Sequence, residues 1–207
     1  MSVRFALAAA LLAILSSLAF AAAEQRFDTA EGADVRRVSW GMSVRQVRNL
    51  EPGTPTVVEG VLVIYTTEVN DQPCTVSYLF HDEKLCMVFY QFSDLFAELP
   101  PYFDEVEKVR AELVQRHGDP EIDRWDWEDP MFAEDPALKG EALGLGLVRY
   151  ELGWMTERSL VALRMSGGNL KADILVMYAD VSAFPAGQDR FERLFSAMVG
   201  LPSPYFR

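Results

Sequence analysis

The side chains best suited to acid–base or nucleophilic chemistry are scarce in this sequence. His81 and His117 are its two histidines, and Cys74 and Cys86 are its two cysteines. A nucleophilic triad needs a base held within hydrogen-bond reach of a serine or a cysteine. His81 falls in a predicted hairpin turn and His117 at a predicted helix C-terminus, where a partly protonated imidazole interacts favourably with the helix dipole. Both histidines therefore have ordinary structural explanations.

The sequence motifs of common enzyme sites are also missing. The chain contains no Gly-x-Ser-x-Gly elbow, no His-Glu-x-x-His zinc site and no glycine-rich phosphate loop. Nothing in the spacing of its carboxylates selects a pair for glycoside hydrolysis. We expect a protein that is not an enzyme, without catalytic residues, cofactor or metal. A hydrolase with scattered carboxylates is the least favoured alternative.

Acidic residues crowd into one short segment, residues 121–135. Such oxygen density suits Ca²⁺, but the spacing differs from an EF-hand loop and the required glycine is missing. We interpret the segment as a solvated acidic connection and leave Ca²⁺ binding open. Its members are Glu121, Asp123, Asp126, Glu128, Asp129, Glu134 and Asp135.

Two tryptophans lie within that segment. Trp125 and Trp127 are two residues apart, so on a strand both would face the same side. They either pack under the sheet or, half-exposed beside Asp126 and Glu128, form a contact surface for a basic partner. Trp125, Trp127, Asp126 and Glu128 are therefore our candidate partner-binding residues.

Composition bounds the class of protein. Half of the 207 residues are hydrophobic and 12% are aromatic, which is typical of a chain that buries a core. The 31 acidic and 19 basic residues give a net charge of −12, which disfavours nucleic acid as a partner. We expect a globular acidic protein.

The N-terminus has the pattern of a secretory signal peptide over residues 1–23. Arg4 precedes an apolar run, and small residues including Ala21 and Ala23 follow it. A membrane anchor is the competing interpretation, but we expect cleavage near Glu24 and a periplasmic or secreted product. No cysteine follows the run for lipid attachment, and no later segment is long enough to span a bilayer.

Export would expose the two cysteines to oxidising conditions. In the predicted hairpin, pairing Phe80 with Leu85 places Cys86 beside Leu79 and Cys74 beside Gln91, roughly 16 Å apart along the ladder. A disulfide needs Cα atoms within about 7 Å. We predict two unbridged thiols that fill the core, with a reactive or intermolecular thiol as the alternative.

The hydrophobic pattern predicts helices and antiparallel strands. A capping box of Ser43 and Gln46 starts a helix over 44–50, and a second helix, with Tyr102, Val106, Val109 and Leu113 on one side, ends at Gly118. Residues 166–169 predict a turn, and Phe191, Leu194, Phe195 and Met198 predict a last helix. Predicted strands cover 61–67, 75–80, 85–92, 147–152, 159–165 and 171–178.

Both faces of the predicted hairpin are substantially apolar. The pairing of Phe80 with Leu85 groups Cys74, Val76, Tyr78, Phe80, Leu85, Met87 and Phe89 on one face. The other face collects Thr75, Ser77, Leu79, Cys86, Val88, Tyr90 and Phe92. We expect helices to cover the first face, while the second is either covered too or offered to a partner.

The order of elements repeats. A hairpin, a proline break, an amphipathic helix, a glycine and a proline occur twice, which predicts an α+β fold whose antiparallel sheet packs against amphipathic helices in two tandem helix-plus-sheet repeats. We expect a loosely ordered segment over 24–38 and one domain over 39–207. Its pseudo-repeat halves would be 39–99 and 100–207.

The opening Trp40-Gly41-Met42-Ser43, followed by Val47, a strand and a hairpin, resembles the helix-then-sheet module of SmpA/OmlA-type outer-membrane assembly proteins. The doubled plan is similar to that of secreted β-lactamase inhibitor proteins. The whole chain after the leader resembles exported bacterial proteins that open with the same four residues. This chain lacks the anchoring cysteine of the assembly lipoproteins. The resemblance implies a binding or scaffolding module of the cell envelope and brings no catalytic residues.

We therefore expect a non-catalytic exported module of the bacterial envelope that engages a protein partner through a concave sheet face and the segment around Trp125 and Trp127. The alternative is a small-molecule or lipid carrier with a pocket between sheet and helices. We expect no stable membrane insertion after leader cleavage. The identity of the partner or ligand and the oligomeric state stay open.

Overall fold

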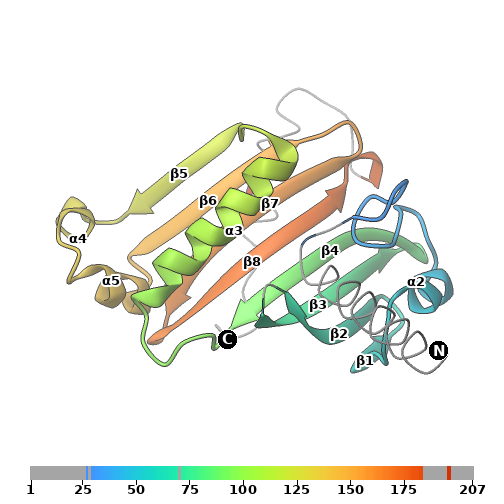
Figure 1. Cartoon of the computed structure of the whole chain (residues 1–207), viewed down its shortest axis with the longest axis horizontal. Coiled ribbons are helices and arrows are strands. Elements are labelled where there is room, and N and C mark those ends of the chain that lie inside the picture. The colour runs from blue at the N-terminus through green and yellow to red at the C-terminus, as the bar shows by residue number, and fades with distance from the viewer. Residues whose placement is uncertain (1–26, 28, 70, 184–194, 197–207) are drawn as a thin grey trace, which may run out of the picture.

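The computed structural model describes residue 27 and residues 29–69, 71–183 and 195–196. These residues form an α+β fold around one eight-stranded sheet, in which every neighbouring pair of strands is antiparallel (Figure 1). The strand order is β1-β2-β3-β4-β8-β7-β6-β5. The strands are β1 (Val57–Glu59), β2 (Leu62–Val69), β3 (Gln72–His81), β4 (Lys84–Ser93), β5 (Ile122–Trp127), β6 (Val148–Met155), β7 (Ser159–Gly168) and β8 (Lys171–Asp180).

The longest helix of the described residues, α3 (Pro101–His117), crosses one face of the sheet (Figure 1), which we call the helix face. Its buried side chains include Tyr102, Val106, Val109 and Leu113, and it ends at Gly118, whose φ of +78° suits glycine. The other helices of the described part are α2 (Val44–Leu50), α4 (Pro130–Glu134) and α5 (Lys139–Leu145), and a 3₁₀ turn covers Val181–Ala183. No helix among the described residues is long and apolar enough to cross a bilayer.

The predicted capping box at the start of α2 is present. Ser43 Oγ accepts a hydrogen bond from the Gln46 backbone N–H at 3.4 Å, and Gln46 Oε1 accepts one from the Ser43 backbone N–H at 2.9 Å. These two bonds fix the helix start and confirm the prediction.

The hairpin of β3 and β4 turns as the sequence predicts. Phe80 pairs with Leu85, and Asp82 and Glu83 take the positive φ values, +48° and +62°, of a two-residue hairpin turn. The pairing then shifts, because Leu79 lies opposite Met87 and Cys86 is the extra residue of a β-bulge.

The bulge exchanges the two faces of β4 beyond Leu85. Val88, Tyr90 and Phe92 join the core on the helix face, whereas Met87 lies on the opposite face with Cys86. The predicted grouping of Met87 and Phe89 with Tyr78 is therefore wrong, because one added residue reverses the direction of each following side chain. Phe89 packs with the residues of the opposite face.

Both cysteines are buried and unbridged, as predicted. Burial raises the pKa of the Cys74 thiol to about 12, so this thiol stays protonated at neutral pH. Cys86 Sγ donates to the Leu79 carbonyl oxygen at 3.4 Å. Each thiol thus fills space in the core.

The sheet is buried on its opposite face too. Leu160, Ala162, Met177 and Ala179 are fully buried there and belong to one cluster with Phe195. The predicted last helix otherwise falls outside the described residues at Phe191, Leu194 and Met198, as does the predicted signal peptide over 1–23.

Part of the segment before residue 39 packs against the helix face. Val35 and Val38 are buried in the same cluster as Phe27, and they pair with each other in a short bridge. The segment for which we expected little order therefore contributes apolar side chains to the core.

Candidate functional site

The four candidate partner-binding residues lie on and just after β5, the outermost strand beside β6 (Figure 1). Trp125 and Trp127 are half-buried and pack against the core of the helix face. Asp126 alternates to the other side of the strand, and Glu128 follows the strand end; both are exposed. The structure thus brings the two tryptophans together and separates Asp126 from them.

The two tryptophans belong to an aromatic stack, which we define as Phe103, Trp125, Trp127 and Tyr150. Phe103 of α3 stacks on Trp125 with ring centroids 5.6 Å apart and on Trp127 at 6.3 Å. Trp125 also stacks on Tyr150 of β6 at 4.4 Å. The two interpretations from the sequence, core packing and a half-exposed surface, each hold in part, since the rings pack beneath α3 and remain partly exposed.

A polar network fixes α3 over this stack. Arg110 Nη2 donates to Asp123 Oδ2 at 2.7 Å, and the Tyr150 hydroxyl donates to Asp123 Oδ1 at 2.9 Å. Arg110 Nε completes the triangle by donating to the Tyr150 oxygen at 3.0 Å. Burial raises the pKa of Tyr150, which keeps its hydroxyl available as a donor. The network holds three elements, α3, β5 and β6, in fixed relation.

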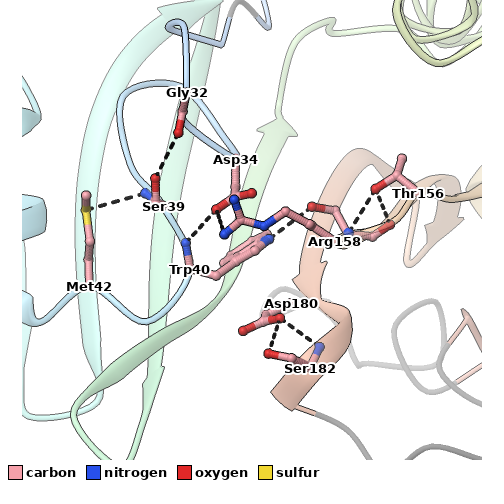
Figure 2. Close-up of polar contacts among 10 residues, drawn as sticks. Gly32, Asp34, Ser39, Trp40, Met42, Thr156, Arg158, Asp180 and Ser182 are labelled. Carbon is pink, nitrogen blue, oxygen red and sulfur yellow. Dashed lines mark hydrogen bonds and ion pairs between the residues drawn. The ribbon is translucent and has the colours of Figure 1, made fainter.

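The Trp-Gly-Met-Ser segment lies near the C-terminal end of α3, away from the aromatic stack. The Trp40 backbone N–H donates to Asp34 Oδ2 at 2.9 Å, and its indole Nε1 donates to Ser159 Oγ at 3.0 Å (Figure 2). The same Asp34 oxygen forms an ion pair with Arg158 Nη2 at 3.0 Å. Asp34 therefore joins Trp40 to the turn between β6 and β7.

The next residues of that segment bond to β4. Gly41 N–H donates to the Leu85 carbonyl at 2.9 Å, and Leu85 N–H donates to the Met42 carbonyl at 2.8 Å. Gly41 has a φ of +80°, which favours glycine. Because Trp40 bonds to the start of β7, the segment connects β4 with β7 and so has a structural role.

Trp40→Phe is expected to lower the free energy of unfolding by about 1 kcal/mol, because an aromatic ring, though a smaller one, remains while the hydrogen bond to Ser159 is lost. Urea unfolding followed by circular dichroism measures the change. The control is Trp127→Phe, the same change of ring size in the aromatic stack, for which we expect a smaller loss of stability than for Trp40→Phe. Equal losses of stability in the two variants would show that the hydrogen bond from Trp40 to Ser159 does not add to the effect of the smaller ring.

Two hollows flank the turn between β6 and β7. The wider one, about 630 Å³, is lined by residues that include Trp40, His81, Lys84 and Asp180. Asp180 Oδ1 accepts from the Ser182 backbone at 2.8 Å and from its hydroxyl at 2.7 Å (Figure 2). The smaller hollow, about 250 Å³, lies on the helix face where α3 ends.

His117, the last residue of α3, lies against the sheet. Its ring centroid is 5.7 Å from that of Trp154 and 6.0 Å from that of Tyr178. Burial, with a contribution from Arg116, lowers the pKa of His117 to about 4. The interpretation of His117 as a partly protonated partner of the helix dipole is therefore wrong, since its imidazole is neutral at pH 7.

His81 lies where the sequence predicts, at the end of β3 beside the hairpin turn. Its side chain is exposed, and Nε2 is 3.6 Å from Asp82 Oδ2. Among the described residues, no group of three or more His, Cys, Asp and Glu side chains is arranged to hold a metal ion. The acidic segment 121–135 falls within those residues.

Sequence reasoning missed the residues of the smaller hollow. Asp34, His117, Arg158 and Tyr178 come from four separate parts of the chain, and no spacing pattern connects them. The one signal nearby was the Trp40 opening, whose indole bonds to Ser159 beside the hollow.

The chain was compared with models of known protein families, with curated proteins and with solved structures, and no comparison gave a match. A proposal about function therefore depends on the structure itself, in particular on the aromatic stack and the two hollows.

Proposed function

We propose that this protein is an exported, non-catalytic binding module of the bacterial envelope that engages a protein partner at the aromatic stack. The observation that carries the proposal is the half-exposed state of Trp125 and Trp127 on the outermost strand of the sheet. Tryptophan that is rigidly stacked yet partly exposed loses little entropy when a partner covers it, and it is enriched at the centres of interfaces.

The charges around the stack indicate a basic partner. Glu128 and Asp129 are exposed just after β5, Asp126 is exposed on the other side of this edge strand from the two tryptophans, and the chain carries a net charge of −12. Charge complementarity of this kind raises association rates and weakens as salt is added. We therefore expect the partner surface to carry lysine or arginine beside its apolar contacts.

The edge of the sheet is a better docking surface than its centre. On the face opposite α3, Leu160 and Met177 are fully buried in a cluster that includes Phe195. A partner would have to displace those contacts to reach the middle of that face. We therefore assign the contact to the β5 edge rather than to the concave face expected from the sequence.

The strand order supports a second part of the proposal, that the chain consists of two duplicated halves, 39–99 and 100–207. Strands β1–β4 form one meander after α2, and β5–β8 form another after α3, with β4 pairing to β8 between them (Figure 1). The same plan underlies the resemblance to secreted β-lactamase inhibitor proteins. In such an arrangement both outer strands, β1 and β5, become edges.

The binding proposal predicts that neutralising the β5 edge weakens partner capture. Immobilised protein is incubated with envelope extract, and the captured partner is identified by mass spectrometry and then titrated in purified form. We expect Asp126→Asn with Glu128→Gln to lower affinity by roughly fivefold or more, and Trp127→Ala to lower it further.

The matched control is Glu59→Gln with Glu68→Gln, which removes the same charge from exposed sites near the opposite edge of the sheet. This control should bind as the unmodified protein does. Equal affinity for all variants, with the fold intact by circular dichroism, would contradict the proposed surface.

A further inference from the structure

The two outer strands of the sheet differ in how well their edges are protected. Among the described strands, β5 pairs with β6 alone, over 6 residues in continuous register, whereas β1 has only 3 residues. Proteins commonly protect a sheet edge with a short strand, a proline or a lysine. The strand β5 contains neither proline nor lysine. Of these two edges, the β5 edge is therefore the better place to add a strand (Figure 1).

The backbone groups of alternate β5 residues point away from β6. The Glu128 N–H donates to the Leu147 carbonyl oxygen at 2.9 Å, which fixes the phase of hydrogen bonding between the two strands. In an antiparallel pair, hydrogen-bonded residues alternate with residues whose N–H and C=O groups face the other way. The backbone groups of Asp126 therefore face β6, as those of Glu128 do. The residues of β5 whose backbone groups face the open edge are Asp123, Trp125 and Trp127.

The side chains of β5 alternate between the two faces of the sheet. Trp125 and Trp127 lie half-exposed on the helix face, and Arg124 and Asp126 are exposed on the opposite face. Arg124 Nη2 donates to Glu151 Oε2 at 2.6 Å, yet 55% of the Arg124 side chain remains exposed. A guanidinium has five N–H donors, so this one can bond to a second carboxylate. The edge therefore presents a cation and an anion two residues apart.

A second copy of β5 is complementary to this edge in one antiparallel register. Outward backbone groups must meet outward groups, so each usable register is centred on a residue and not between two residues. Centring on Trp125 places Arg124 of each copy opposite Asp126 of the other. Centring on Arg124 or on Asp126 would instead place like charges directly opposite each other, which is destabilising. The register centred on Trp125 uses residues 123–127, which all lie within β5.

We propose that two copies of this protein pair antiparallel along β5 about a two-fold axis at Trp125, with Arg124 of each copy bonded to Asp126 of the other. Such an interface is isologous, so each contact occurs twice. It also brings the half-exposed Trp125 rings of the two copies together on the helix face.

This inference goes beyond the proposed binding of an envelope partner. The second copy and that partner would occupy the same edge, so self-pairing would limit partner binding as the protein concentration rises. Self-pairing is measured on the purified protein without any partner. The two proposals can therefore fail separately.

The expected affinity is modest. One added strand buries less surface than a standard protein interface, and the net charge of −12 on each copy opposes association. We expect a dissociation constant on the order of 10 to 100 µM. Sedimentation velocity from about 1 µM to about 1 mM should therefore show the monomer at the low end and the dimer at the high end.

Asp126→Lys is expected to weaken the dimer about tenfold or more, because each new lysine would face Arg124 of the other copy. The matched control is Glu59→Lys, the same change of charge at an exposed residue of β1. This control should pair at least as strongly as the unmodified protein. Equal weakening in the two variants would overturn the proposed register.

Mixing two variants tests which residues face each other. Arg124→Glu alone should also fail to pair, because it places Glu opposite Asp126. A mixture of Arg124→Glu with Asp126→Lys should form a mixed dimer, since opposite charges then meet at both sites. If both variants are folded by circular dichroism and the mixture stays monomeric, the proposed register is wrong.

Amide hydrogen exchange gives a second measurement, which holds even where Arg124→Glu loses its fold with its bond to Glu151. In the unmodified protein, raising the concentration should slow the exchange of the outward amides of Trp125 and Trp127 more than that of the amide of Glu128, which already bonds to Leu147. A protein that stays monomeric up to about 1 mM would overturn the proposal. A dimer that leaves the Trp125 and Trp127 amides unprotected would overturn it too, because its interface would lie elsewhere.

Discussion

Gly167→Ala is expected to lower the free energy of unfolding by about 3 kcal/mol, measured by urea denaturation. Gly167 lies in β7 at the point where α5 packs against this strand. A Cβ atom at this position would overlap the carbonyl oxygen and carbon of Leu143 in α5. Because Leu143 is fully buried and the overlap is with backbone, no side-chain rotation relieves it. The helix must move away from the sheet, and core contacts are lost.

The matched control is Gly60→Ala, in the turn between β1 and β2. Nothing lies within 4 Å of a Cβ atom there, and no positive φ is required. We expect a change within about 0.5 kcal/mol, with slight stabilisation from the lower entropy of the unfolded chain. A comparable loss in the two variants would mean that α5 is not held closely against β7.

Gly167 also shows how sequence analysis misreads a glycine. Residues 166–169 predict a turn, but β7 continues through Gly168, and the turn itself uses Asn169 and Leu170 with φ values of +54° and +60°. Glycine in a strand marks either a turn or the close approach of another backbone. The sequence shows that residue 167 has no side chain, but it does not show which element packs into the space that a side chain would occupy.

The same reasoning explains why α5 was not predicted. Its seven residues include Gly140 and Gly144, and each glycine disfavours a helix by about 1 kcal/mol relative to alanine. Those glycines lie where a Cβ would meet Pro100 at 2.9 Å and Leu99 at 2.6 Å. Packing against the start of α3 therefore overrides the local preference.

The strands of the two long hairpins were predictable, because alternating and apolar runs between turn residues define them. The bulge at Cys86 was not, since no residue type marks it. Its effect is large: the burial of Val88 and Tyr90 on the helix face depends on that one extra residue. Register on either side of a bulge is fixed by packing, which the sequence pattern of one strand does not contain.

The aromatic stack and the smaller hollow also differ in how far the sequence predicts them. Trp125 and Trp127 are two residues apart, so their common side of β5 follows from strand geometry alone. Phe103, which covers them, comes from a helix that the sequence places in the chain but not over a particular strand. The hollow joins residues as distant as Asp34 and Tyr178, and its existence depends on the whole topology.

Acid is expected to destabilise the unmodified protein more than it destabilises the variant His117→Gln. The pKa of His117 lies near its ordinary value of 6.5 in the unfolded chain and is lowered to about 4 in the folded protein. Between these two values the unfolded state binds the proton and the folded state does not. The contribution of the neutral His117 side chain to the free energy of unfolding is therefore complete above pH 6.5, declines as the pH falls toward 4, and changes no further below that.

The groups that face this ring decide the size of the effect. Arg116 opposes protonation, while the carboxylates of Asp34 and Glu157 and the guanidinium of Arg158 line the same hollow. A gap between pH 6.5 and about 4 corresponds to about 3 kcal/mol for a fully buried group. Because the ring is only partly buried, we expect about 2 kcal/mol.

The measurement is urea unfolding at a series of pH values from 7.5 to about 4 for the unmodified protein, His117→Gln and His81→Gln. Carboxylates titrate in the same range, so the informative quantity is the difference between the curves rather than either slope. His81 is exposed in its turn, and His81→Gln should follow the unmodified protein throughout. The free energy of unfolding of His117→Gln could instead change with pH as that of the unmodified protein does. That result would show that His117 binds a proton as easily in the folded protein as in the unfolded chain, and that its imidazole is not held against Trp154 and Tyr178.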